Sequence, residues 1–170
     1  MIRRGAALAA LALVAGCAAV PRSADTLAGR LSVRVEAWQG QPVRSVASAF
    51  ELAGTAERGE LQLTSPLGTL VARARWSAEG ATLATPDGES RYADLDELSR
   101  SALGEALPLR ALPDWLRGRP WSAAPSRATA QGFEQLGWQV GLARLADGIV
   151  EASRAAPPSV TVRAKLDPAE

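Results

Sequence analysis

The stretch RLSVRVE, from Arg30 to Glu36, alternates strictly between polar and apolar side chains. Leu31, Val33 and Val35 point to one side of an extended chain, and the intervening polar side chains point to the other. This period of two predicts a β-strand with one buried face and one face in water.

Similar patterns recur along the chain on both sides of its middle. Short alternating segments follow at residues 46–54, 60–63, 69–76 and 81–85, and a last one covers residues 160–166. Residues 131–143 read as a hairpin that turns at Leu136-Gly137, and Ile149-Val150 as a brief strand. Because turn residues separate these segments, we expect an antiparallel sheet.

The middle of the chain changes to helical spacing. Asp94 followed by Glu97 resembles a capping box, apolar residues then recur every three or four positions, and Gly104 suits a helix end. A second helical patch covers residues 107–118, where Pro113 should start or kink a helix. Strands on both sides of helices predict an α+β domain, a curved sheet with helices on one face. Periodicity leaves open whether sheet and helices enclose a solid core or a cavity.

The first residues, MIRRGAALAALALVAGC, resemble a bacterial lipoprotein signal. Arg3 and Arg4 precede an apolar run too short to span a bilayer as a helix, and small residues lead directly to Cys17. We expect residues 1–16 to be a signal peptide and Cys17 to carry diacylglycerol and an acyl chain such as palmitate. Residues 17–28 would then be the lipidated cysteine and its tether. Ala18, where an aspartate would favour inner-membrane retention, points to the outer membrane.

The composition excludes several function classes. Cleavage of the expected signal peptide removes Arg3 and Arg4. The mature chain then has 17 basic residues instead of 19, against 18 acidic residues, and a net charge of −1. This balance argues against nucleic acid as a partner and against a polybasic membrane patch. The chain has no histidine, one cysteine and no nucleotide-binding motif, so neither histidine-dependent catalysis nor a metal centre is expected. We interpret the chain as not an enzyme, because the acidic clusters at residues 87–89 and 94–97 look like solvated surface.

One turn carries an unusual residue at its tip. Ser65-Pro66-Leu67-Gly68 has the composition of a type I turn, yet its third residue is a large apolar side chain. A single exposed leucine is common and needs no special role on its own.

Three segments together give the chain a family resemblance: LQLTSPLGTLVA (61–72), RYADLDELSRSALGEALPLRALPDWLRG (91–118) and GFEQLGWQV (132–140). In order and spacing they resemble the LolB family, outer-membrane receptors of the bacterial lipoprotein-localisation system. The resemblance implies an incomplete antiparallel β-barrel covered by a helical lid that encloses an apolar cavity, with residues 29–170 as the acyl-chain-binding domain. It also implies a monomer, anchored by lipid at the periplasmic face of the outer membrane.

The resemblance further implies a function and its residues. The protein would accept lipoproteins from the periplasmic carrier LolA by binding their acyl chains, and would insert them into the inner leaflet of the outer membrane, without a cofactor. Leu67 would be the membrane-delivery leucine, on a loop made of Ser65, Pro66, Leu67, Gly68 and Thr69. The candidate cavity-lining residues are Val33, Phe50, Leu61, Trp76, Leu83, Trp115 and Val140, which would look the same in a solid core. The alternative is a non-enzymatic scaffold lipoprotein with a solid core that binds a protein partner.

Overall fold

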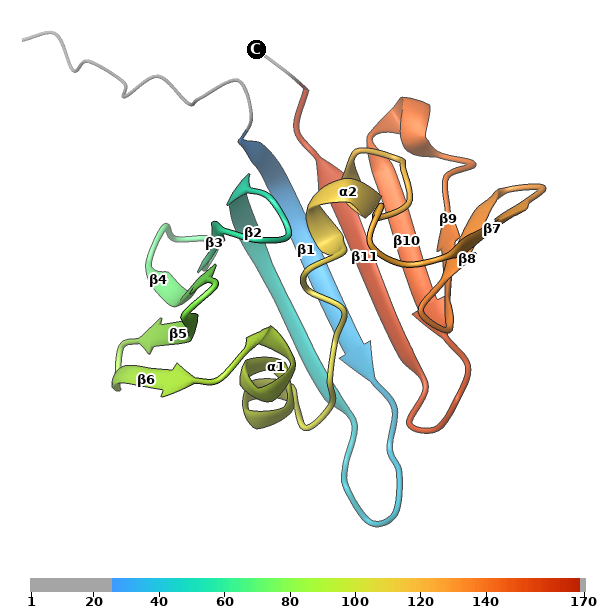
Figure 1. The fold of residues 1–170 in the computed structure, drawn as a ribbon. Coiled ribbons are helices and arrows are strands. Elements are labelled where there is room, and N and C mark those ends of the chain that lie inside the picture. Colours follow the sequence, from blue (N-terminus) through green and yellow to red (C-terminus); the bar gives the residue numbers. More distant parts are fainter. Residues whose placement is uncertain (1–25, 169–170) are drawn as a thin grey trace, which may run out of the picture.

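A computed structural model describes residues 26–168, and in this part of the chain eleven strands form one antiparallel sheet (Figure 1). The strand order is β6-β5-β4-β3-β2-β1-β11-β10-β9-β8-β7. The strands are β1 (Leu27–Val35), β2 (Arg44–Gly54), β3 (Gly59–Thr64), β4 (Leu70–Ser77), β5 (Gly80–Thr85), β6 (Gly88–Tyr92), β7 (Ser126–Thr129), β8 (Gly132–Gln135), β9 (Trp138–Gly141), β10 (Ile149–Arg154) and β11 (Val160–Leu166). The helices are α1 (Leu95–Leu103), α2 (Leu112–Leu116) and the single 3-10 turn η1 (Leu145–Asp147).

Strand β1 is the central strand of the sheet, with five strands on either side, and it pairs with β2 and with β11. Val33 lies opposite Val46 of β2 and Val162 of β11. Leu31, Val33 and Val35 are buried, which confirms the inward face predicted from their alternation. The first and last strands of the domain are thus neighbours, and every other pairing joins strands that follow one another in the sequence.

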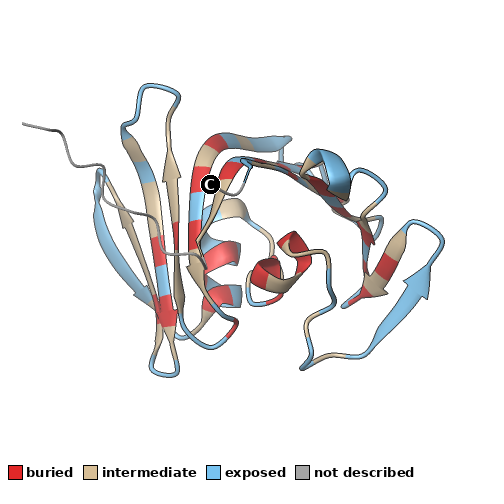
Figure 2. Ribbon diagram, turned by 90° about the horizontal axis from the view of Figure 1, so that it is seen from above, coloured by how far each residue is buried: buried red, intermediate tan, exposed pale blue. Residues whose placement is uncertain are grey.

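The sheet is curved and does not close. Its two edges, β6 and β7, are not paired with each other, and the segment between them carries both α-helices. Figure 2 shows α1 and α2 inside the curve of the sheet, with buried residues both on the helices and along the strands. The predicted α+β architecture, a curved antiparallel sheet with helices on one face, is confirmed at this level.

Helix α1 begins and ends where its sequence predicts. The Asp94 side chain accepts a hydrogen bond from the Glu97 amide at 2.8 Å, and the Glu97 carboxylate accepts one from the Ala93 amide at 2.7 Å. These bonds satisfy amide groups that a helix start leaves without partners. Gly104 ends the helix in the left-handed conformation, at φ 77°.

The second helix is shorter than the predicted patch of residues 107–118. Helix α2 covers only Leu112–Leu116, with Pro113 in its first turn. Proline has no amide hydrogen and its ring collides with the carbonyl four residues earlier, so no regular helix extends back through Leu109. Residues 107–111 form turns instead, such as the hydrogen bond from the Ala111 amide to the Pro108 carbonyl.

The two edge strands were not predicted, and β10 is longer than the brief strand expected at Ile149-Val150. All four residues of β7 and the first four of β6 are exposed. An edge strand exposed on both faces needs no apolar alternation, so its sequence lacks the signal that reveals a half-buried strand.

A buried glutamine joins the chain after α2 to the sheet. The Gln135 side-chain oxygen accepts hydrogen bonds from the Trp115 indole and from the Trp121 amide, at 2.8 and 2.9 Å. Its side-chain nitrogen donates to the carbonyls of Trp121 and Ala124, both at 2.8 Å. Gln135 is only 2% exposed, yet both of its polar atoms have two partners. Residues 121–124 are thereby attached to β8.

Candidate functional site

An apolar pocket of about 360 Å³ lies between the sheet and the chain around α1. Apart from Ser48, Thr85 and Ser99, its lining is entirely apolar. The sheet contributes Leu31, Val33, Val46, Leu61, Leu63, Val71, Ala72, Ala74 and Leu83, and the chain around α1 contributes Leu98, Ala102, Leu103, Leu107 and Leu109. Its size lies at the low end of the range of about 300–1,000 Å³ for small-molecule pockets. Such a surface suits a hydrocarbon ligand.

The pocket's most buried hydroxyl, that of Ser99, is already occupied by the protein. It accepts a hydrogen bond from the Leu107 amide at 2.9 Å and donates one to the Asp96 carbonyl at 3.2 Å. Because both roles of the hydroxyl are filled within the protein, it offers little to a polar ligand. The same bonds connect α1 with the segment that follows it.

The structure brings together three of the seven candidate cavity residues. Val33, Leu61 and Leu83 line the apolar pocket. The other four lie outside it, in the buried core: Phe50, Trp76, Trp115 and Val140. Contact of any of these seven side chains with an acyl chain stays a prediction.

Two of the outlying candidates are held by specific contacts in the core. Trp115 packs edge-on against Phe133, with ring centroids 6.3 Å apart, and its ring also lies 6.2 Å from that of Trp138. The Trp76 indole donates a hydrogen bond of 2.9 Å to the Thr55 carbonyl. These contacts account for both tryptophans as core residues without a ligand.

Sequence reasoning did not name the residues that line the pocket from the helical side. The spacing of Leu98, Ala102 and Leu103 revealed one apolar helix face but not what that face covers. Leu107 and Leu109 lie in turns where no regular period applies. The resemblance to a family with a lipid cavity was the only signal that could have pointed to them.

The loop Ser65–Thr69 joins β3 to β4 as a tight, hydrogen-bonded turn. The Gly68 amide donates to the Ser65 carbonyl at 2.9 Å, and the Ser65 amide donates to the Thr69 carbonyl at 2.8 Å. The Ser65 hydroxyl also accepts bonds from the Leu67 and Thr69 amides. Gly68 has φ 80°, a conformation that glycine adopts without strain. The predicted turn is confirmed, and its backbone is well fixed.

Leu67 at the tip of this loop is 93% exposed. The other exposed large apolar residues of the described chain are 38–48% exposed, so Leu67 is unusual in presenting its whole side chain to solvent. The structure therefore places an exposed apolar side chain on a hydrogen-bonded turn. A role for the five loop residues in membrane delivery stays a prediction.

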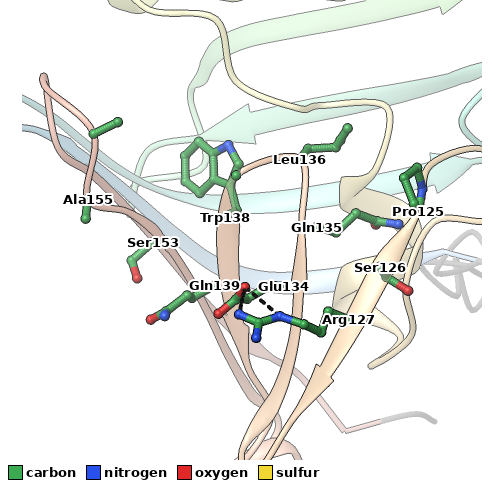
Figure 3. A pocket seen from close by; sticks show the side chains of 12 residues that line it. Pro125, Ser126, Arg127, Glu134, Gln135, Leu136, Trp138, Gln139, Ser153 and Ala155 are labelled. Atoms are coloured by element: carbon green, nitrogen blue, oxygen red, sulfur yellow. Dashed lines mark hydrogen bonds and ion pairs between the residues drawn. The ribbon is translucent and has the colours of Figure 1, made fainter.

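A second hollow, of about 580 Å³, lies by β7, β8 and β9 and is much more polar (Figure 3). Figure 3 shows the ion pair between Arg127 and Glu134, which is 2.5 Å long and belongs to neighbouring strands. The hydrogen bond from Arg127 holds the pKa of the Glu134 carboxyl below its usual value. An exposed ion pair makes this hollow a poor site for a hydrocarbon chain.

Other kinds of site find no support in residues 26–168. They contain no group of three or more metal-ligating side chains. In the same range, no helix has both the length and the apolar character needed to cross a membrane. Cys17, the signal peptide and most of the tether lie outside the described residues.

Comparisons with known proteins agree on one family. A family model described as outer membrane lipoprotein LolB matches residues 25–167. The chain is 38% identical over 151 residues to the outer-membrane lipoprotein LolB of Bordetella petrii, covering 80% of this chain and 75% of that protein. It is 36% identical to the outer-membrane lipoprotein LolB of Ralstonia nicotianae, over 77% of this chain and 71% of that protein. For the protein of the same name from Chromobacterium violaceum, identity is 32% over 86% of both chains.

Proposed function

The chain belongs to the LolB family of outer-membrane lipoproteins, and from that premise we propose that it is a receptor for lipoproteins in the outer membrane. It accepts lipoproteins from a LolA-like periplasmic carrier by binding their acyl chains. It then releases them into the inner leaflet of the outer membrane.

The apolar pocket between the sheet and α1 carries this proposal. Exposing a sixteen-carbon chain to water would cost on the order of 12 kcal/mol, at about 0.8 kcal/mol for each methylene group. A pocket lined almost wholly by leucine, valine and alanine side chains removes most of that cost. A scaffold protein with a solid core would have no such hollow, so the pocket favours acyl-chain binding.

The helical segment acts as the lid of this site. Leu98 and Leu103 of α1, together with Leu107 and Leu109 after it, cover the pocket opposite the strands. A volume of about 360 Å³ is small for the several acyl chains of a lipoprotein. We therefore expect α1 and residues 104–111 to move outward from the sheet when cargo enters.

Transfer runs down a gradient of affinity, because the chain contains no nucleotide-binding motif that could supply energy. The receptor must bind acyl chains more tightly than the carrier does, and less tightly than the bilayer does. Its role is to bind and release rather than to catalyse a reaction, and it works as a monomer.

Cys17 anchors the receptor at the periplasmic face of the outer membrane. Stable attachment needs at least two acyl chains, which a diacylglycerol thioether and an acylated amino group provide. With the domain held at the bilayer, Leu67 supplies a transient apolar contact through which cargo leaves.

A transfer assay tests the proposal. A form with Cys17→Ala behind a cleavable secretory signal is mixed with a carrier protein that holds a tagged lipoprotein, and the two are then separated. We expect the lipoprotein to move to the receptor and a triacylated lipopeptide to displace an apolar fluorescent dye from it. The same peptide without acyl chains is the control and should displace nothing. Absence of both transfer and displacement would refute the proposal.

A further inference from the structure

A third hollow, of about 820 Å³, lies beside the loop that carries Leu67. One part of its lining is the loop itself, through Ser65, Pro66 and Gly68. The rest comes from the end of β3 and from β2, β1 and β11. We call this hollow the loop-side groove.

Three cationic side chains line the loop-side groove, namely Arg30, Arg163 and Lys165. All three residues are exposed. Arg30 of β1 is the direct cross-strand partner of Lys165 of β11, and Arg163 lies two residues from Lys165 on the same face. The three charges therefore cluster on the sheet face opposite Leu31 and Val33.

These charges are poorly neutralised within the described residues. Neither Arg30 nor Arg163 forms an ion pair there, although Glu151 lies opposite Arg163 on β10. Lys165 donates a hydrogen bond to the Asp147 carbonyl, which leaves its charge unpaired. The groove thus combines positive charge with free hydrogen-bond donors.

Small side chains leave room in front of the cations. Ser32, Ala47 and Ala49 lie on the same face of β1 and β2 and form part of the lining. Thr64, the residue before the loop, pairs with Ala49, which in turn pairs with Arg30. With adjacent strands about 4.8 Å apart, the cation cluster begins only two strands from the base of the loop.

We propose that the loop-side groove binds the phosphate of anionic phospholipid headgroups at the membrane surface that Leu67 enters. The proposal rests on the proposed function, in which this loop contacts the bilayer, and it deepens that function by naming the lipid class. Two observations support the proposal: the groove is positively charged, as an anionic headgroup requires, and the loop that carries Leu67 is part of its lining. When Leu67 enters the bilayer, the cations next to the loop lie at the level of the lipid headgroups. The headgroup contact would fix the loop's orientation while cargo leaves.

Vesicle binding tests the proposal directly. The probe is a vesicle of equal parts phosphatidylglycerol and phosphatidylethanolamine, compared with one of phosphatidylcholine and phosphatidylethanolamine, and the protein is the Cys17→Ala form described above. We expect tighter binding to the anionic vesicle and a loss of that preference at high salt. Arg30→Gln and Arg163→Gln should each weaken anionic binding about fivefold, which corresponds to about 1 kcal/mol for each basic side chain.

Arg58→Gln is the matched control. Arg58 is also an exposed arginine, but it precedes β3, at the strand end opposite the loop. The same change of net charge there should leave vesicle binding within about twofold of the parent protein. Equal losses in all three variants would mean that net charge alone matters and would overturn the proposal.

Two further outcomes separate this inference from the function on which it rests. The groove variants should still take up a triacylated lipopeptide, since none of the substituted residues lines the apolar pocket. If the parent protein takes up no lipopeptide, the proposed function fails, whatever the vesicles show. If the groove variants bind vesicles normally but receive cargo more slowly from the carrier, the groove is a carrier-docking surface and the headgroup proposal is wrong.

Discussion

The buried side-chain oxygen of Gln135 accepts a hydrogen bond of 2.8 Å from the indole nitrogen of Trp115. This bond connects α2, which lies inside the curve of the sheet, directly to strand β8. The same glutamine holds residues 121–124 through three more hydrogen bonds. The C-terminal part of the helical segment is therefore attached to the sheet by polar contacts as well as by aromatic packing.

Gln135→Leu should destabilise the protein by about 3–5 kcal/mol. The leucine would leave the Trp115 indole and the Trp121 amide without their partner, and each buried unsatisfied group costs about 1–3 kcal/mol. Urea unfolding followed by tryptophan fluorescence measures the change. Gln131→Leu, at an exposed position before β8, is the control and should change stability by less than about 0.5 kcal/mol. An unchanged unfolding midpoint for Gln135→Leu would show that the network contributes little.

Leu67→Glu should leave folding and cargo uptake intact and block delivery to vesicles. A leucine side chain gains about 1.5–3 kcal/mol on full burial, whereas a carboxylate is repelled from apolar surroundings. Since Leu67 is almost fully exposed, the folded domain does not depend on it. Transfer of a labelled lipoprotein from receptor to vesicle measures delivery, and Leu67→Met is the control that keeps the tip apolar. Normal delivery by Leu67→Glu would reduce the loop to a turn without a membrane role.

Ala72→Trp should reduce acyl-chain uptake at least tenfold by filling the apolar pocket that Ala72 lines. The added indole occupies space that a hydrocarbon ligand needs, and displacement of an apolar dye by a triacylated lipopeptide measures the loss. Thermal unfolding of the same samples shows whether the domain is intact. Ala130→Trp adds the same side chain at an exposed turn and should bind normally. Equal binding by both variants would place the acyl site elsewhere.

The Glu134 carboxyl should titrate below the usual glutamate pKa, because Arg127 donates a hydrogen bond to its charged form. The pair's stabilising effect is therefore complete above the ordinary glutamate pKa and is lost as pH falls through the lowered value. Carbon-13 NMR of the carboxyl measures the titration. Arg127→Gln should return the Glu134 pKa toward its usual value, whereas Arg34→Gln, on a different strand pair, should not. A parent protein that already titrates normally would contradict the ion pair.

The sequence predicts the central strands well because their alternation reflects burial on one face. Leu31, Val33 and Val35 were placed correctly from their spacing alone, and so was the start of α1 from Asp94 and Glu97. The edge strands were missed because they are exposed on both faces. Pro113 is expected to start or kink a helix, and it does lie in the first turn of α2, but the residues before it form turns rather than the predicted helical patch.

The candidate site was harder to predict, because it depends on which strands become neighbours. Val33 and Trp76 are both buried apolar residues, yet only Val33 lines the pocket. Nothing in the local sequence distinguishes them. The cations of the loop-side groove meet for the same reason, since Arg30 and Lys165 come from opposite ends of the domain. A net charge close to zero gave no sign of this cluster.

The two edge strands, β6 and β7, are not paired with each other, so the distance between them can change without the loss of a strand pairing. Ten strand pairings hold the described sheet together, and none of them joins these two edges. A closed barrel would have to break a hydrogen-bonded ladder in order to widen. In the described sheet, β6 and β7 are connected through the helical segment and not by strand pairing. The sheet can therefore open further while all ten strand pairings stay intact. We therefore expect the size of the ligand that the domain can hold to depend on the separation of β6 and β7 rather than on the strand pairings.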